Sequence, residues 1–202
     1  FSVLEWVKVL DSYGALWLFI VLMVSTPGPA NLLIMTAGAQ QGFWRCMPFN
    51  LGLITGKLVL NSAMALGLTL LVQQHPGLAK VFALCSAAYM IWLALRGWNA
   101  HLESQQHRRV LSFRDGVLVH PLSPKTWVMV VLAFSEFMPV SPSFAEQYFL
   151  IPLSFALAQL VFHNAWCLAG VLLRRALGAS KGLNRSLALL TIAVVLWALL
   201  LA

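Results

Sequence analysis

Two short stretches of the sequence place prolines and polar residues inside runs that are otherwise apolar. The first is STPGPANLL at residues 25–33, and the second is HPLSPKTWV at residues 120–128. Proline has no N–H, and its ring clashes with the carbonyl four residues earlier, so a regular helix cannot continue through either stretch. The carbonyls that would lose their donors are those of Met23, Ser25, Val117 and His120. In an apolar solvent these groups need protein or water partners, so both stretches predict a polar site.

The same residues are well suited to starting a new helix. Proline is favoured at the first helical position, and Gly or Ser is favoured at the cap before it, as in Gly28-Pro29 and Ser123-Pro124. A helix start directs free N–H groups and a positive dipole end toward an anion, while the freed carbonyls can accept from a cation. An amino-acid zwitterion needs both. The alternative is a pair of plain proline kinks, which membrane helices tolerate; two breaks at matching places favour a binding site.

Two lysines occupy the interior of apolar segments. Lys57 and Lys125 each lie far from the nearer end of their segment. A basic group at that depth costs about 2.5–3.5 kcal/mol, and it usually faces a cavity or a partner, although snorkelling is the alternative. Lys125 directly follows Ser123-Pro124, so it adds positive charge to the second helix start.

Several neutral polar residues lie at similar depth. Asn61 is one helical turn after Lys57, Asn31 follows Pro29, and His163 and Asn164 lie in the motif FHNAW. His163 and His120 can change protonation near neutral pH, which makes them and Lys57 candidates for proton coupling. Each of these residues can instead be a satisfied core residue that hydrogen-bonds a neighbouring helix. No Asp or Glu is central to any apolar segment, so the predicted site suits neutral side chains.

Other chemistries lack the residues that they need. The three cysteines, Cys46, Cys85 and Cys167, have no metal or disulfide spacing, and no motif indicates a cofactor. A heavy-metal cation exporter would need His, Cys or carboxylate clusters. A thiol–disulfide electron carrier with a three-plus-three helix arrangement would need cysteines in the two proline-containing segments, and these have none. No nucleophile and base pair indicates an enzyme.

Composition identifies the elements that must position these residues. The chain has 202 residues, of which 60% are hydrophobic and 9% charged, too few charges for a water-facing surface. It is predicted to be an all-α integral membrane protein. The first residue is Phe1, which indicates that a few residues precede it, and the first apolar run is too long for a signal peptide. Six stretches are long enough to span a bilayer: 15–39, 47–72, 78–97, 114–137, 148–172 and 184–202.

The basic residues separate the two sides of the predicted membrane domain. Loops one, three and five contain Arg45, Arg96, Arg108, Arg109, Arg114, Arg174, Arg175, Lys181 and Arg185, whereas the opposite side has only Lys8 and Lys80. Basic loops favour the cytoplasm, so both termini are predicted to lie outside and loop 98–113 inside. The net charge of +7 is therefore assigned to these loops and not to nucleic-acid binding.

The two proline stretches lie three predicted helices apart, so the two halves of the chain would have opposite orientations. This predicts a 3+3 inverted repeat within one transporter domain, 1–202, with repeat 1 at about 15–97 and repeat 2 at about 114–202. Gly52-x-x-x-Gly56 and Ala165-x-x-x-Ala169 predict close helix contacts, within one chain or in a homodimer.

Several motifs together resemble the LysE-type (LysE/RhtB) amino-acid exporter family. They are TPGPANLL, the following GFWR, AAYMIWLALRGW, SPK and HNAW…AG, and the resemblance covers nearly the whole chain. It implies a bacterial inner-membrane protein with six hydrophobic segments that exports amino acids against proton entry. The family's motifs correspond here to Pro27, Gly28, Pro29 and Asn31, and to Pro124 and Lys125.

The sequence departs from the family pattern at Ala30, Ser123 and His163, which concerns the substrate more than the fold. The resemblance is greatest to the branch that exports cysteine, O-acetylserine and related small neutral amino acids. The resulting hypothesis is a secondary exporter that works by alternating access. Both helix starts and Lys125 would hold the substrate carboxylate, while released carbonyls, Asn31 and Asn164 would receive its ammonium group, with Asn61 in support.

Overall fold

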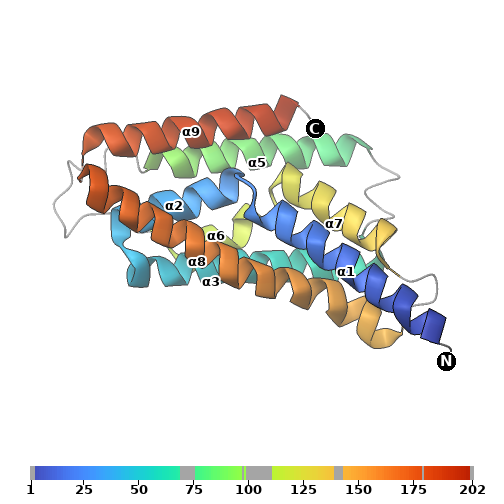
Figure 1. Cartoon of the computed structure of the whole chain (residues 1–202). Coiled ribbons are helices and arrows are strands. Elements are labelled where there is room, and N and C mark those ends of the chain that lie inside the picture. Colours follow the sequence, from blue (N-terminus) through green and yellow to red (C-terminus); the bar gives the residue numbers. More distant parts are fainter. Residues whose placement is uncertain are drawn as a thin grey trace.

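The computed structural model describes residues 3–68, 76–96, 98, 111–138, 143–178 and 180–200, and these form helices and connecting turns without any strand. Figure 1 shows them as one elongated helical bundle. The helices are α1 (Val3–Ser25), α2 (Pro29–Gln41), α3 (Phe43–Ala63), the π-helix η1 (Met64–Leu68), α5 (Pro76–Arg96), α6 (Phe113–Val119), α7 (Pro124–Glu136), the π-helix η2 (Glu146–Leu150), α8 (Ile151–Leu177) and α9 (Lys181–Leu200).

Each of the six predicted segments coincides with a helix or with a pair of consecutive helices. Within the described residues, three helices are long and apolar enough to cross a membrane, and a bent pair makes a fourth. They are Phe43–Gly67, Tyr148–Leu177, Lys181–Leu200 and the pair Tyr13–Ser25 with Pro29–Gln41; Leu84–Arg96 is a shorter apolar helix. The protein is thus an all-helical chain with several membrane-span candidates. The six-span 3+3 arrangement stays a prediction, and most of loop 98–113 lies outside the described residues.

The first predicted break lies between α1 and α2, which meet at an angle of 53° near the middle of the bundle (Figure 1). The backbone of Gly28 is extended, with φ −154° and ψ 170°, and Pro29 begins α2 without any side-chain cap. The prediction of a helix start at Gly28-Pro29 is confirmed. The bent pair Tyr13–Ser25 with Pro29–Gln41 agrees with the segment predicted at 15–39, and the helix α1 itself extends further, to Val3.

The second predicted break is confirmed between α6 and α7. Helix α6 ends at Val119, a short turn follows, and α7 begins at Pro124. The backbone carbonyl of Ser123 accepts from the N–H groups of Thr126 and Trp127 at 2.9 and 3.1 Å. The cap is therefore made by backbone, and the Ser123 hydroxyl makes no capping hydrogen bond.

Helices α2 and α8 approach each other so closely that their backbones touch. A Cβ atom added to Gly170 would lie 1.9 Å from the carbonyl oxygen of Met35, and one added to Gly38 would lie 2.2 Å from that of Cys167. The predicted contact through Ala165 and Ala169 is wrong for the single chain, because both residues are exposed. They lie on a different face of α8 from Gly170.

Helices α3 and α6 make a second contact of the same kind. Added Cβ atoms at Gly52 and Gly56 would each lie 2.1 Å from a carbonyl oxygen of α6, those of Phe113 and Val117. Gly116 faces α3 in return, because a Cβ atom added there would lie 2.3 Å from the carbonyl oxygen of Phe49. The contact predicted from Gly52 and Gly56 is confirmed. Both glycine contacts lie in the half of the bundle that adjoins the basic loops.

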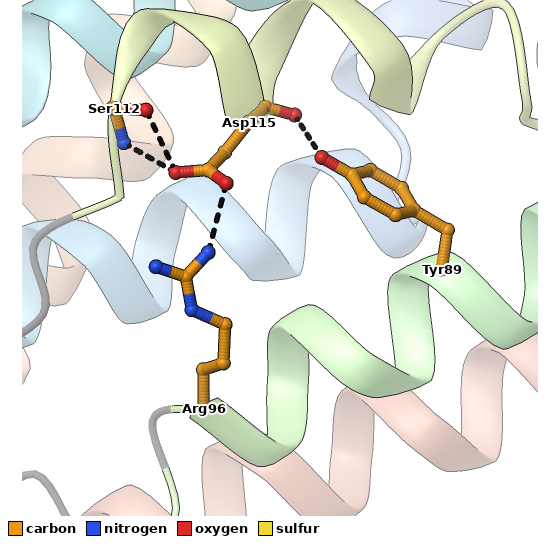
Figure 2. Close-up of polar contacts among 4 residues, drawn as sticks. All are labelled: Tyr89, Arg96, Ser112 and Asp115. Carbon is orange, nitrogen blue, oxygen red and sulfur yellow. Dashed lines mark hydrogen bonds and ion pairs between the residues drawn. The ribbon is translucent and has the colours of Figure 1, made fainter.

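A polar cluster anchors α6 to the end of α5 (Figure 2). Arg96 forms an ion pair with the Asp115 carboxylate at 2.8 Å, and the other carboxylate oxygen accepts from the Ser112 N–H and hydroxyl at 2.8 and 2.9 Å. Tyr89 donates its hydroxyl proton to the backbone carbonyl of Asp115 at 3.0 Å. An acidic residue in the first turn also matches the helix dipole. The cluster therefore holds the helix that leads directly into the second break.

In the other half of the bundle, a side-chain hydrogen bond connects α1 to η2. Tyr13 of α1 donates a hydrogen bond to the carboxylate of Glu146, which begins η2. The same carboxylate accepts from the N–H and hydroxyl of Ser143 at 2.8 and 2.7 Å. These hydrogen bonds, that from Tyr13 first, lower the pKa of Glu146 below its usual value.

Apolar side chains cover the outer surface of the bundle. Leu18, Leu66, Val161 and Leu189 are each more than half exposed. Apolar residues all round a helix bundle are expected for a protein whose solvent is lipid. The polar residues described below are by contrast turned inward.

Candidate functional site

A small pocket lies between the two helix breaks, close to the middle of α8. Its volume is about 30 Å³, which is room for roughly two water molecules. It is lined by Met23 and Val24 of α1, Gly28, Pro29, Ala30 and Asn31 at the first break, His120, Ser123, Lys125, Thr126 and Met129 at the second, and Gln159 and His163 of α8. Residues far apart in sequence thus meet at one place; Gly28 and Thr126, for example, are 98 positions apart.

Lys125 connects the two breaks. Its Nζ donates to the hydroxyl of Thr26 at 2.8 Å and to the backbone carbonyl of Thr26 at 3.3 Å. The side chain passes directly over Gly28, where an added Cβ would lie 3.2 Å from both Cδ and Nζ. A glycine at position 28 therefore leaves room for the lysine, which is the only basic side chain among the lining residues other than the two histidines.

The carbonyls freed by the first break have protein donors. The amide of Asn31 donates to the carbonyls of Val24 and Thr26, both at 2.8 Å, and the Trp166 indole donates to that of Ser25 at 3.3 Å. The Thr26 hydroxyl is placed to donate to the carbonyl of Met23 at 3.0 Å. These carbonyls are therefore already occupied. Asn31 uses its NH₂ group on the backbone, which leaves its Oδ1 as its remaining acceptor at the pocket.

His120 lies at the second break between two polar partners. Its Nδ1 is 3.0 Å from the Thr126 hydroxyl, and its Nε2 is 2.9 Å from the amide nitrogen of Gln159. All three side chains are buried. The other amide atom of Gln159, Oε1, has no hydrogen-bond partner among the described residues. The pocket thus contains a buried acceptor that no donor in the described part of the chain satisfies.

A second histidine stacks on the first and is held from the opposite side. The rings of His120 and His163 are 5.6 Å apart and nearly parallel, at 5°. Nδ1 of His163 is 3.2 Å from Oδ1 of Asn50, whose amide donates to Oδ1 of Asn164 at 2.9 Å. Asn164 in turn donates to the carbonyl of Leu160 at 2.7 Å. Asn164 is therefore part of the support of His163 and does not line the pocket.

The structure brings together most of the residues predicted for the site. Gly28, Pro29, Asn31, Ser123, Lys125, His120 and His163 line the pocket, and Pro124 begins the helix beside it. Pro27 is exposed, and Lys57, Asn61 and Asn164 lie outside the lining. Sequence reasoning missed Gln159, Thr126, Asn50 and Thr26. Gln159 lies one helical turn before His163, and this spacing is the signal that would have placed it on the same face.

Lys57 and Asn61 form a separate buried pair on one face of α3. Both side chains have zero exposure, and neither Nζ of Lys57 nor the amide atoms of Asn61 has a hydrogen-bond partner among the described residues. The Lys57 Nζ lies 4.1 Å from the centre of the Phe155 ring. A cation–π contact offsets only part of the cost of burying an amine.

We expect Lys57→Met to raise the free energy of unfolding by about 1–4 kcal/mol, because methionine fills the same space without a buried unpaired amine. Thermal unfolding of the purified protein in detergent measures the change. Leu53→Met, one turn earlier in the same helix, is the control, and its effect should stay below about 1.5 kcal/mol. A lower melting temperature for Lys57→Met would mean that the amine is paired.

These features define a helical membrane protein with an internal polar site between two interrupted helices, which is the architecture of a membrane transporter. The comparison with known families agrees: residues 20–202 match the LysE type translocator family. The chain belongs to the LysE type translocator family, and the resemblance inferred from its motifs is confirmed.

Curated relatives are efflux proteins. The chain is 27% identical over 146 residues to the homoserine/homoserine lactone efflux protein of Salmonella typhimurium, covering 66% of this chain and 71% of the relative. It is 28% identical over 184 residues to the cysteine/O-acetylserine efflux protein of Escherichia coli O157:H7, covering 89% and 93%. A similar protein of Salmonella choleraesuis is 28% identical over 186 residues. No solved structure matches the chain.

Proposed function

We propose that this protein exports small neutral amino acids across the bacterial inner membrane by alternating access, in exchange for protons. Membership of a translocator family and the names of the efflux relatives support export of amino acids in general. The charge pattern of the loops supports an orientation with both termini outside, and a homodimer stays a prediction.

One observation carries the proposal: two helix starts and one lysine converge on the same pocket. Pro29 and Pro124 have no N–H, and the carbonyls of Gly28 and Ser123 take up later N–H groups of the first turns. The first-turn donors that remain are the N–H groups of Ala30 and Asn31 in α2 and of Lys125 in α7, and the Lys125 side chain adds an ammonium group. A substrate carboxylate is the group that such donors bind best. Asn31 Oδ1 and Gln159 Oε1 remain as acceptors for the substrate ammonium group.

The rest of the lining favours a neutral substrate side chain. Met23, Val24 and Met129 provide an apolar wall, and no Asp or Glu lines the pocket. A cationic side chain would lose its hydration there without gaining a carboxylate partner. The pocket therefore suits a short, uncharged side chain.

The size of the pocket supports alternating access. A pocket of about 30 Å³ is small for an amino acid, which fits a conformation whose walls move apart to admit substrate. The half adjoining the basic loops is closed by backbone contacts at Gly38, Gly52, Gly56, Gly116 and Gly170. The two breaks are the natural hinges, because an interrupted helix bends there without losing regular hydrogen bonds.

The two alternative functions are a heavy-metal cation exporter and a thiol–disulfide electron carrier. Among the described residues, no group of three or more His, Cys, Asp or Glu could hold a metal ion. The free thiols of Cys46 and Cys167 lie in α3 and α8, which the predicted repeat would make equivalent. Both side chains have zero exposure, however, so a partner thiol cannot reach them for exchange.

Efflux from proteoliposomes tests the function. Vesicles preloaded with a mixture of neutral amino acids are expected to lose one or a few of them faster when a pH gradient is imposed. Protein-free vesicles control for leakage, and a cooperative thermal transition shows that the reconstituted protein is folded. Failure of the folded protein to release any amino acid would overturn the proposal.

A further inference from the structure

The side chain of Gln159 satisfies only one of its two ends, and the end without a partner is buried in the pocket. It is 1% exposed, its amide nitrogen lies 2.9 Å from Nε2 of His120, and its Oε1 has no partner among the described residues. An unpaired buried carbonyl oxygen is costly, so a ligand that donates a hydrogen bond there is strongly favoured.

The orientation of this amide depends on the protons of His120. In the neutral ring one nitrogen donates and the other accepts. With the amide nitrogen of Gln159 donating to Nε2, the ring proton is on Nδ1 and is donated to the Thr126 hydroxyl. Gln159 Oε1 then remains available to a ligand in the pocket.

A protonated His120 donates from both nitrogens, so it can no longer accept from Gln159. The amide of Gln159 must then rotate. Its Oε1 accepts from the Nε2–H of His120, and its NH₂ group takes the position in the pocket that Oε1 held before. A substrate ammonium group would meet a donor in place of an acceptor, as well as a new positive charge on the ring.

We propose that Gln159 binds the ammonium group of the substrate, and that protonation of His120 reverses the Gln159 amide and thereby expels the substrate. This deepens the proposed function and rests on it, because it assigns the proton-coupling residue of the same site. One proton from the outer solution forms the Nε2–H bond, and its release to the cytoplasm restores the acceptor for the next substrate molecule. The pocket therefore holds a substrate or a proton, but not both, which is the requirement for exchange.

His120 is better placed than His163 to act in this way. The amide that faces His163 belongs to Asn50, and its orientation is held by Asn164, which is itself held by the carbonyl of Leu160. Reversing Asn50 would break this series of hydrogen bonds. Reversing Gln159 breaks no other bond, because its Oε1 has none to lose.

The charges around His120 make it harder for the pocket to hold a proton and a substrate ammonium group at the same time. Lys57 of α3, Lys125 of α7 and His163 of α8 are the titratable groups that act on its ring, and α2 contains no titratable residue. No carboxylate is present among the residues that line the pocket. A proton on His120 and an ammonium group in the pocket would therefore repel each other without compensation.

The experiment measures the pH dependence of substrate affinity in proteoliposomes, using the amino acid that the efflux assay identifies. In the unmodified protein, strict exclusion makes the half-saturating concentration rise by about tenfold per pH unit below the titration of His120. His120→Gln cannot be protonated. It should bind substrate equally well at each pH and catalyse exchange of labelled for unlabelled substrate, while the pH gradient no longer drives net export.

Gln159→Met tests the ammonium contact separately. Loss of a hydrogen bond to a charged group should raise the half-saturating concentration of the amino acid about tenfold or more, while binding of the same acid without its amino group should not change. Gln41→Met, at the far end of α2, is the matched control and should behave as the unmodified protein. His120→Asn, a smaller amide that cannot be protonated either, is the second variant for coupling and should likewise lose the response to the pH gradient.

Each failure has a distinct meaning. Gradient-driven export by the His120→Gln variant would overturn the role of His120. If that variant does not fold, gradient-driven export by His120→Asn would overturn it. Unchanged affinity in Gln159→Met would overturn the ammonium contact. Both results would leave amino-acid export intact, whereas absence of transport in the unmodified protein would overturn the proposed function together with this inference.

Discussion

Lys125→Met is expected to reduce the initial rate of amino-acid efflux by about 100-fold. The Nζ atom is the donor with a full charge at the pocket. Hydrogen bonds to charged groups contribute about 1.5–3 kcal/mol each, so the loss of two such bonds would greatly slow transport. The substitution also disconnects the two breaks, because the bonds from Nζ to the hydroxyl and carbonyl of Thr26 disappear. Efflux from proteoliposomes at saturating and limiting substrate separates these contributions.

Two further variants define what the Lys125 result means. Lys125→Arg keeps the charge in a larger, planar head group that must fit over Gly28, so we expect partial activity. Lys181→Met removes an exposed lysine at the start of α9 and should leave efflux unchanged. Normal efflux by a folded Lys125→Met protein would remove this lysine from the mechanism.

Gly170→Ala is expected to destabilise the folded protein by about 3 kcal/mol and to abolish transport, although it adds a single methyl group. That methyl carbon would lie 1.9 Å from the carbonyl oxygen of Met35 and 3.0 Å from the backbone nitrogen of Ala39. Backbone atoms cannot rotate away as a side chain does, so α2 must move, and overpacking of this kind costs about 1–3 kcal/mol or more. Thermal unfolding in detergent and efflux assays measure the two effects.

Gly14→Ala is the matched control for Gly170→Ala. A Cβ added to Gly14 meets no atom within 4 Å, and the residue lies inside α1, where alanine favours the helix by about 1 kcal/mol. We expect its melting temperature to be unchanged or higher. Similar melting temperatures for the two variants would show that α2 and α8 are not in backbone contact.

The arrangement of helices along the chain could be predicted because its causes are local. Apolar runs locate the membrane segments, and the prolines locate both breaks through the absence of an N–H. Apolar runs do not give the helix ends in the same way. Glu5, Lys8 and Asp11 precede the first apolar run, yet α1 begins at Val3 because helical hydrogen bonding continues through charged residues.

The site was predictable only in part, because hydropathy does not say which face of α8 points to the pocket. His163 and Asn164 are neighbours in sequence, but consecutive residues on a helix point about 100° apart. His163 therefore lines the pocket while Asn164 faces Asn50 of α3. The rotation that separates them also brings Gln159 to the pocket. It is set by packing between distant glycines such as Gly38 and Gly170.

The hydrogen bonds of the first break have a consequence for the order in which the protein is made. Asn31 and Thr26 supply donors to the carbonyls of Met23, Val24 and Thr26 as soon as the first helix pair leaves the ribosome. The donor to the carbonyl of Ser25 is the indole of Trp166, which is synthesised 141 residues later. The first break is therefore completed only when the fifth apolar segment has been inserted, and early in biosynthesis its last carbonyl must be served by water or the translocation machinery.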